Sequence, residues 1–395
     1  MIFSGRMLWR GGTRGHETGH VEGLPAATGT GAAAEHLPDA EWVRGSWEVR
    51  EGRVHRLDGS GPAPDLTGWA VPGLVDVHCH IGISPEEGPA TRAEQEEQAL
   101  ADRDSGVLAV RDCGVPVDNS WVKERHDLPR LVRAGRHIAR PRRYMRGLAV
   151  ELEDPRRLPA EIVRQAAVGD GWVKIVGDWI DRSAGADSDL DPLWPREVLV
   201  DAVAAAHDAG ARVAVHCFSH AAVDDLLEAG VDDIEHGTGM DDDQMAEAAA
   251  RGVTVTPTLL QIELFGDFAD QAGSRYPRYA TTMRAMYEDR RGHTERLFDS
   301  GVRLLPGTDS GGYQRHGSIA RELDLWVRAG ASPARVLDLA TWRARDTLGL
   351  PSLSPGAPAD LVVFDADPRR DPSALAHPSA VVLRGEVVAE RSPRH

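Results

Sequence analysis

The sequence predicts an α/β fold, consisting of a (β/α)8 barrel and a small β-sandwich domain formed by the N- and C-terminal segments. Three observations lead to this prediction. A unit of helix, glycine and short β-rich run recurs through the middle of the chain, the predicted strands end in polar residues, and both flanks read as short alternating strands. The predicted barrel spans residues 71–351, and residues 1–70 and 352–395 form the composite β domain.

The recurring unit is marked by a glycine between a helical segment and a strand, as in DAGARVAVHC and EAGVDDIEHG. A glycine at this point ends a helix in the left-handed conformation, which other residues adopt only with strain. Apolar residues in the preceding segments, such as PREVLVDAVAAAHDAG, follow helical spacing. The glycines concerned are Gly106, Gly135, Gly210, Gly230, Gly252 and Gly301.

Two further runs complete eight predicted strands. VGDGWVKIVGD fits the same unit, and GLVDVHCH at residues 73–80 precedes all the others. Eight strands alternating with helices over about 280 residues match the usual size of a (β/α)8 barrel. A doubly wound open sheet is the competing architecture, but no glycine-rich dinucleotide fingerprint follows the first strand, which favours the barrel.

The flanks differ from the middle of the chain. SWEVREGRVHRLDG near the N-terminus and ADLVVFDAD with AVVLRGEVVAE near the C-terminus have the alternation of β-hairpins. We expect these segments to pair with each other beside the barrel. Residues 11–40 have little apolar periodicity, which predicts a long surface loop.

Composition and charge limit the partners. The formal net charge of -17 argues against nucleic acid or an anionic membrane, because both attract a positively charged surface. No apolar run is long enough to span a bilayer, and MIFSGRMLWRGG at the N-terminus lacks the order of a signal peptide, so we expect a cytoplasmic protein acting on a small molecule. Three widely spaced cysteines predict reduced thiols. The oligomeric state stays open, with a homo-oligomer among the alternatives.

Residues that suit metal binding end five of the predicted strands. In a barrel, the carboxyl ends of the strands meet at one mouth, where the working groups gather. Imidazoles with a carboxylate form the ligand set of borderline divalent ions, above all Zn2+. Four other histidines, His137, His207, His220 and His293, are interpreted as hydrogen-bonded core or surface residues. The strand-end candidates are His78, His80, Lys174, His216, His236 and Asp309.

Lysine occurs only twice in the chain, at Lys123 and Lys174, and nearly all other positive charges are arginines. Lys174 lies in the apolar run Trp172 to Val176, where an unpaired ammonium is costly to bury. It is either a side chain that reaches solvent from a strand end, or an amine that must lose its proton and react, which a guanidinium cannot do. One lysine does not decide between these readings.

Several motifs together resemble the amidohydrolase superfamily, nearest its imidazolonepropionase-like and Xaa-Pro dipeptidase-like branch. They are VPGLVDVHCH, VKIV, VAVHC, IEHG, PGTDSG and PGAPADLVVFDADP, and the likeness runs from about residue 43 to residue 390. The resemblance implies a binuclear metal site. His78, His80 and Asp309 would hold one ion, His216 and His236 the other, and Lys174, carboxylated by CO2, would bridge both as a carbamate.

The resemblance also implies an activity. A hydroxide held between two ions would attack a substrate carbonyl, and Asp309 would serve as general base and acid. The expected ion is Zn2+, with Mn2+, Co2+ or Fe2+ as alternatives. We expect hydrolysis of a C-N amide bond in an N-acyl amino acid or dipeptide-like substrate. Alternatives are cyclic amide hydrolysis or deamination, lactone or ester hydrolysis, and a non-catalytic barrel scaffold.

The substrate contacts are less clearly marked. The branch usually continues the lysine strand with a threonine and paired glycines, where this chain has GDW at residues 177–179, and it tends to carry a histidine in the segment where this chain reads RGLAVELED. Arginine could bind a substrate carboxylate, and aromatic residues could line an apolar pocket. The candidate substrate contacts are His316, Tyr313, Arg140, Arg142 and Trp179.

Overall fold

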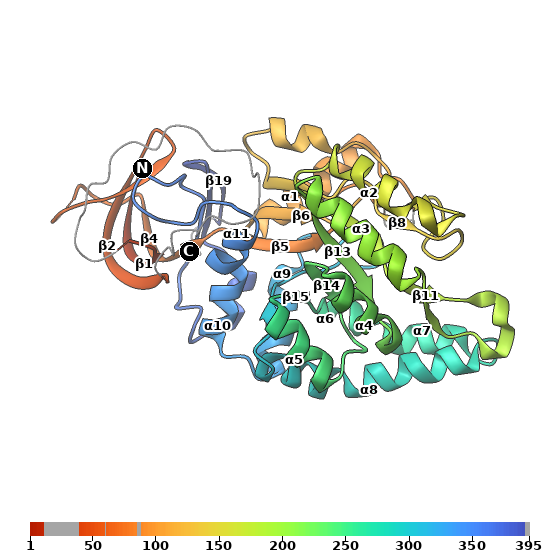
Figure 1. Ribbon diagram of the computed structural model, residues 1–395. Coiled ribbons are helices and arrows are strands. Elements are labelled where there is room, and N and C mark those ends of the chain that lie inside the picture. Colours follow the sequence, from red (N-terminus) through yellow and green to blue (C-terminus); the bar gives the residue numbers. More distant parts are fainter. Residues whose placement is uncertain (12–38, 60, 85–87, 392–395) are drawn as a thin grey trace.

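The computed structural model describes residues 1–11, 39–59, 61–84 and 88–391 (Figure 1). A sheet built from both ends of the chain lies on one side of the molecule, and an α/β body built from the middle of the chain lies on the other. The surface loop predicted for residues 11–40 falls almost wholly outside the described residues.

The sheet of the two chain ends has seven strands in the order β19-β18-β17-β4-β1-β2-β3. β4 pairs in parallel with β1 and antiparallel with β17, so it joins the N-terminal strands to the C-terminal ones. The predicted pairing of the flanks is thereby confirmed, whereas the second layer of a β-sandwich stays a prediction. The strands are β1 (Ile2–Trp9), β2 (Glu41–Arg50), β3 (Arg53–Arg56), β4 (Leu66–Pro72), β17 (Leu361–Phe364), β18 (Ala380–Leu383) and β19 (Glu386–Glu390).

Parallel strands form the centre of the α/β body. They belong to two sheets, ordered β5-β6-β7 and β16-β15-β14-β13-β10-β8-β9. Their bounds are β5 (Leu74–Cys79), β6 (Val107–Asp112), β7 (Arg130–Arg133), β8 (Ile138–Ala139), β9 (Val150–Glu151), β10 (Trp172–Val176), β13 (Arg212–Cys217), β14 (Asp233–His236), β15 (Thr254–Thr256) and β16 (Arg303–Leu304).

Backbone hydrogen bonds link the two parallel sheets at both edges. The His80 N–H donates to the Ser310 carbonyl at 2.7 Å, which ties β5 to the segment after β16. The Asp170 N–H donates to the Arg133 carbonyl at 2.8 Å, which ties β7 to the segment that leads into β10. The pairing of the strands nevertheless defines two separate sheets, so closure into a barrel stays a prediction.

The prediction of a helix before Gly135 is wrong. Residues of β7 pair in parallel with β6, with Leu131 opposite Val110. The run between Pro129 and Gly135 is too short for a stable helix, and Leu131 is buried in the sheet. Sheet pairing therefore decides the conformation of this segment, where local periodicity suggested otherwise.

The helices expected before the other five glycines are confirmed. Each of these glycines has a positive φ, for example 77° at Gly230 and 74° at Gly252, where the left-handed residue caps the helix. The helices are α1 (Arg92–Asp104), α3 (Arg196–Asp208), α4 (His220–Ala229), α5 (Asp242–Arg251) and α8 (Pro277–Asp299).

Two of these helices begin with a capping box. At α1 the Thr91 side chain accepts from the Glu94 N–H, and the Glu94 side chain accepts from the Thr91 N–H. Asp241 and Gln244 make the same reciprocal pair at α5. A cap satisfies backbone donors that have no partner inside the helix, so these sequences fix where the loops after β5 and β14 end.

The remaining elements are short helices and a small antiparallel pair of strands. They are η1 (Ser120–Glu124), η2 (Pro155–Arg157), α2 (Leu158–Ala166), β11 (Asp178–Ile180), η3 (Arg182–Asp187), β12 (Leu190–Pro192), α6 (Leu259–Ile262), α7 (Phe265–Ala272), α9 (Ile319–Arg328), α10 (Pro333–Asp338), η4 (Leu339–Arg343), α11 (Ala344–Thr347) and η5 (Pro372–Ala376).

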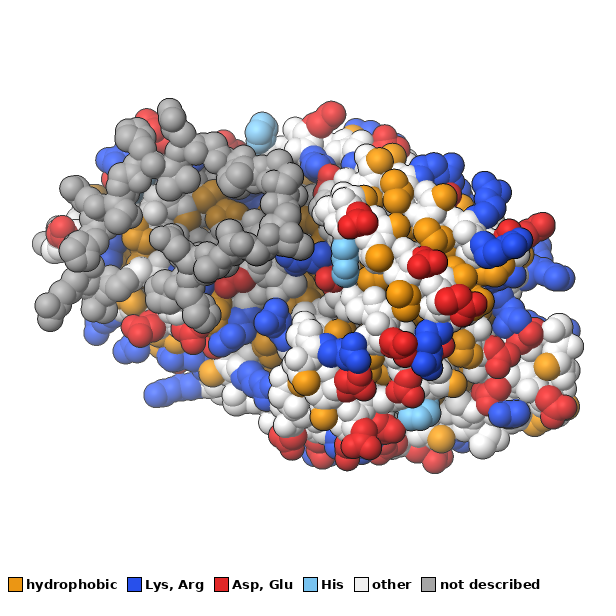
Figure 2. Space-filling view, in the orientation of Figure 1, with side chains coloured by type: hydrophobic (Ala, Val, Ile, Leu, Met, Phe, Trp, Pro, Cys, Tyr) orange, Lys and Arg blue, Asp and Glu red, His pale blue; other side chains and the backbone are white. Residues whose placement is uncertain are grey.

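Charges of both signs share the surface of the α/β body. Figure 2 shows acidic and basic side chains interspersed over the visible face, with acidic groups gathered along its lower edge. Among the helices of the described residues, none is both long and apolar enough to cross a membrane.

A buried ion cluster joins the terminal sheet to the α/β body. Arg345 of α11 is fully buried, and its guanidinium donates to the carbonyls of Gly73 and Pro351 at 3.0 Å each. Its Nη1 lies 3.7 Å from Oδ2 of Asp360, which precedes β17, and Arg130 of β7 donates to the same oxygen at 2.6 Å. Burial lowers the pKa of Arg345 to about 10, and Asp360 opposes that shift.

Replacing Asp360 with alanine should destabilise the protein by about 3–5 kcal/mol, because it leaves the buried Arg345 without its carboxylate. The free energy of unfolding in urea, measured by circular dichroism, gives the comparison. Arg328→Ala, which breaks an exposed pair with Asp324 on α9, is the matched control and should leave the midpoint unchanged. Equal midpoints for Asp360→Ala and the wild type would show that the cluster contributes nothing.

Candidate metal centre

The parallel strands bring the six strand-end candidates together. β5 carries one of them and is directly followed by a second, β10, β13 and β14 carry one each, and the last follows β16. Five are buried, and the aspartate is partly exposed, with 16% of its side chain accessible. The residues are His78, His80, Lys174, His216, His236 and Asp309.

Asp309 lies against both histidines at the carboxyl end of β5. Its Oδ1 is 3.1 Å from Nε2 of His78 and 3.3 Å from Nε2 of His80. The backbone brings it there, since the Asp309 N–H donates to the His78 carbonyl at 2.8 Å and Asp309 has a φ of 56°. A non-glycine residue held in the left-handed region is uncommon and is found most often at functional sites.

His216 and His236 form a second pair. Nδ1 of His216 and Nε2 of His236 face each other at 3.0 Å. One of the two nitrogens must carry a proton to make this a hydrogen bond, and both would be free to bind an ion placed between them. The ring of His236 also lies 5.1 Å from that of His78, so the two pairs are neighbours. His78, His236 and Asp309 form one group of donor atoms close enough to share an ion.

Two of these rings have a hydrogen-bond partner on the opposite nitrogen. Nδ1 of His80 contacts the Gly114 carbonyl at 2.9 Å, and Nδ1 of His236 contacts Oγ1 of Thr258 at 2.6 Å. Nε2 of His216 lies 3.6 Å from Oδ1 of Asp178, which is too far for a hydrogen bond. Histidines that bind metals usually have such a partner behind the ring, because it fixes the tautomer and the ring orientation. Nε2 of His80 has no hydrogen-bond partner among the described residues, which leaves it free for an ion.

Burial keeps three of the imidazoles neutral. It lowers the pKa of His78 to about 3, with the positive charge of Lys174 adding to the effect. Burial likewise holds the pKa values of His216 and His236 well below the ordinary value. A neutral imidazole offers a lone pair to a metal ion, so the donor set fits divalent ions.

Lys174 contacts a carboxylate that the sequence interpretation missed. Its Nζ pairs with Oε2 of Glu235, which is fully buried in β14. Oε1 of Glu235 accepts from Arg111 at 3.1 Å and lies 3.4 Å from Nδ1 of His78. Glu235 directly precedes His236, so the motif IEHG contained the signal, but it was interpreted only for its histidine. Burial lowers the pKa of Lys174 to about 8.

Aromatic rings stand beside the histidines. Trp179 lies 5.3 Å from the ring of His216 and 5.0 Å from Tyr144, measured between ring centroids. Tyr144 also contacts His137 at 4.7 Å. Of the proposed substrate contacts, Trp179 thus has its ring against that of a strand-end histidine.

The other proposed substrate contacts have partners elsewhere. Nδ1 of His316 contacts Oδ2 of Asp102 in α1 at 2.8 Å, and Arg140 donates to the carbonyls of Leu152 and Glu153. Tyr313 is half exposed and packs on Phe268. Arg142 is exposed, and its N–H donates to Glu151. Their roles in substrate binding stay predictions.

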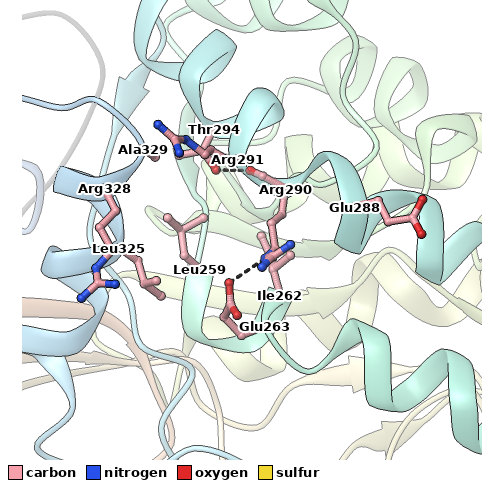
Figure 3. Close-up of a pocket in the computed structure, with 10 residues that line it drawn as sticks. All are labelled: Leu259, Ile262, Glu263, Glu288, Arg290, Arg291, Thr294, Leu325, Arg328 and Ala329. Carbon is pink, nitrogen blue, oxygen red and sulfur yellow. Dashed lines mark hydrogen bonds and ion pairs between the residues drawn. The ribbon is translucent and has the colours of Figure 1, made fainter.

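A cavity of about 520 Å3 lies away from these residues (Figure 3). It is lined by α6, α8 and α9, and two of its charged groups, Arg290 and Glu263, pair at 2.6 Å. None of the six strand-end residues lines it. The chemistry of the strand ends, rather than the volume of this cavity, therefore locates the candidate site.

An α/β fold with imidazoles, a lysine and a carboxylate gathered at strand ends is typical of hydrolases. Residues 69–388 match the model of the amidohydrolase family, and the chain belongs to that family. An uncharacterized protein of Mycobacterium tuberculosis (strain ATCC 25618 / H37Rv) is 48% identical over 350 residues, which are 88% of this chain and 93% of the relative. The predicted superfamily is thereby confirmed.

Solved structures agree with this fold. A Xaa-Pro dipeptidase with bound methionine is 24% identical and has a TM-score of 0.74, covering 87% of this chain and 94% of its own. A putative prolidase from Bifidobacterium longum is 25% identical and has a TM-score of 0.72, covering 90% of this chain and 92% of its own. Members of the family generally bind divalent metals, which agrees with the donor atoms gathered here.

Thr258→Val should weaken divalent metal binding about 10- to 100-fold, because it removes the oxygen behind His236 while keeping the shape of the side chain. Competition with a chromogenic chelator measures the affinity. Thr281→Val makes the same change on the exposed side of α8 and should have no effect. Equal affinities for the two variants would mean that Thr258 does not orient His236.

Proposed function

We propose that the protein is a metal-dependent amidohydrolase that cleaves a C-N amide bond in an N-acyl amino acid or dipeptide-like substrate. One observation supports this most directly. Two pairs of buried imidazoles lie side by side, one facing Asp309 and the other with its nitrogens turned to each other, and one ring of each pair has a hydrogen-bond partner on its far nitrogen. The proposal includes closure of the parallel strands into a (β/α)8 barrel of residues 71–351, with residues 1–70 and 352–395 as a separate domain.

Two ions would fit the two pairs of histidines. His78, His80 and Asp309 would hold one ion, and His216 and His236 the other, which are nitrogen and oxygen donors suited to Zn2+ and also to Mn2+, Co2+ or Fe2+. When bound, the ions would supply an activated water and a Lewis acid for the substrate carbonyl. Asp309 would take a proton from the attacking water and pass it to the leaving nitrogen, since its carboxylate faces the ligand cluster and keeps access to solvent.

Lys174 would bridge the ions as a carbamate formed with CO2. Only a neutral amine reacts with CO2, and burial lowers the pKa of Lys174 to about 8, so part of the amine is neutral near physiological pH. The negative charge of a carbamate would suit a place between two cations, where an ammonium would be repelled. On this proposal the amine exchanges its contact with Glu235 for the ions.

The proposed substrate class is based partly on the similar structures. A Xaa-Pro dipeptidase and a putative prolidase share the fold, and both names refer to hydrolysis of a peptide bond. The aromatic rings of Tyr144 and Trp179 beside His216 would suit an apolar part of such a substrate.

Lys174→Arg should lose the second ion and reduce activity roughly 100-fold or more, because a guanidinium cannot become a carbamate. Metal analysis gives the ion content. The chain has only two lysines, so 13C NMR after incubation with 13C-labelled bicarbonate should show one protein carbamate, absent in Lys174→Arg. Lys123→Arg is the control, since Lys123 forms an exposed pair with Asp170. Unchanged metal content in Lys174→Arg would remove the carbamate from the proposal.

A substrate panel tests the activity itself. Protein loaded with Zn2+, Mn2+ or Co2+ is assayed on dipeptides, N-acyl amino acids, cyclic amides and lactones, with release of product measured by mass spectrometry. Hydrolysis of N-acyl amino acids or dipeptides, abolished by Asp309→Asn, is expected. Turnover confined to lactones or cyclic amides would replace the proposed substrate class, and no turnover by fully loaded protein would favour a non-catalytic scaffold.

A further inference from the structure

His137 lies in the candidate site, although its sequence context suggested an ordinary core histidine. It directly precedes β8 and is 1% exposed. Its ring lies 6.2 Å from that of His80 and 4.7 Å from that of Tyr144, so it stands between a strand-end histidine and the aromatic rings.

One backbone carbonyl holds both His80 and His137. The Gly114 oxygen lies 2.9 Å from Nδ1 of His80 and 3.0 Å from Nδ1 of His137. A carbonyl only accepts hydrogen bonds, so both rings must carry a proton on Nδ1. The position requires glycine, because its φ is 93° and a Cβ there would lie 2.6 Å from the His137 backbone nitrogen.

The opposite nitrogen of His137 is left without a partner. Its Nε2 is buried and makes no hydrogen bond to any described residue. With the proton on Nδ1, Nε2 of a neutral ring is an acceptor, and a buried acceptor without a donor is costly. His137 belongs to none of the groups of three close donor atoms found among the described residues, which argues against an additional metal ligand.

We propose that His137 is a substrate-binding residue whose Nε2 accepts a hydrogen bond from an N–H of the substrate. This inference rests on the proposed function and narrows its substrate class to secondary amides, which carry an N–H beside the acyl carbon, as against the tertiary amides formed by proline. The ring of Tyr144 packs against that of His137, and Nε2 is itself buried from water, which strengthens a hydrogen bond made there. An enzyme discriminates strongly against a substrate that lacks one hydrogen-bond donor when a buried acceptor of the enzyme is then left unpaired.

Two variants distinguish the roles of the two ring nitrogens of His137. His137→Asn keeps an amide N–H near the position of Nδ1, where it can still donate to Gly114, but its side chain ends short of Nε2. His137→Gln extends further and can place an oxygen near Nε2. His293→Asn, which alters a buried imidazole bonded to the Met240 carbonyl, is the control for loss of a core histidine.

The assay uses an N-acyl amino acid and its N-methyl analogue, with the wild type and each variant loaded with the same metal. The wild type should prefer the N–H substrate in kcat/KM on the order of 10- to 100-fold, His137→Asn should lose that preference, and His137→Gln should keep part of it. The visible spectrum of Co2+-loaded His137→Asn should match that of the wild type.

Two results would overturn the proposal. One is a preference in His137→Asn equal to that of the wild type, and the other is a changed Co2+ spectrum or reduced ion content, which would make His137 a metal ligand. If the wild type hydrolyses neither compound, the proposed function fails first. Calorimetric Kd values of the same pair for the Zn2+-loaded proteins then decide on His137, since equal affinities of the wild type for both compounds would contradict its role.

Discussion

The site depends on the hydrogen bonds behind its imidazole rings. A partner on one ring nitrogen decides which nitrogen carries the proton, and the lone pair on the other is then available to an ion or a substrate. Here the Gly114 carbonyl fixes His80, and the hydroxyl of Thr258 contacts His236. Without these partners, the buried rings could turn over or exchange tautomers, and the donor atoms would no longer converge.

Each partner comes from a loop beside the strand whose histidine it holds. Gly114 follows β6, and Thr258 precedes α6. Thr258 is itself held, because the buried carboxylate of Glu322 in α9 accepts from the N–H groups of Leu259 and Leu260 at 2.8 Å each. Glu322 thus acts on His236 through the first turn of α6, so a residue remote from the ligands helps to orient one of them.

The sequence was sufficient for features that depend on local pattern. Helices ending at glycine, and polar residues at strand ends, follow from spacing along the chain, and this led to the six candidate residues that the structure brings together. Contacts between distant segments left no such pattern. The strand nature of β7 depends on pairing with β6, and the places of Glu235 and His137 depend on hydrogen bonds across strands. His316 contacts Asp102 because its loop lies against α1, which residue spacing does not reveal.

The pairing of β4 with β17 has a consequence for how the protein is made. β1 and β4 are synthesised first, yet β4 finds its antiparallel neighbour only when β17, close to the other end of the chain, has left the ribosome. Until then, one edge of the growing N-terminal sheet offers unpaired backbone groups. If the N-terminal strands pair before β17 is made, the free edge of β4 can pair with other chains and cause aggregation. A chaperone that covers this edge during translation would then raise the yield of folded protein.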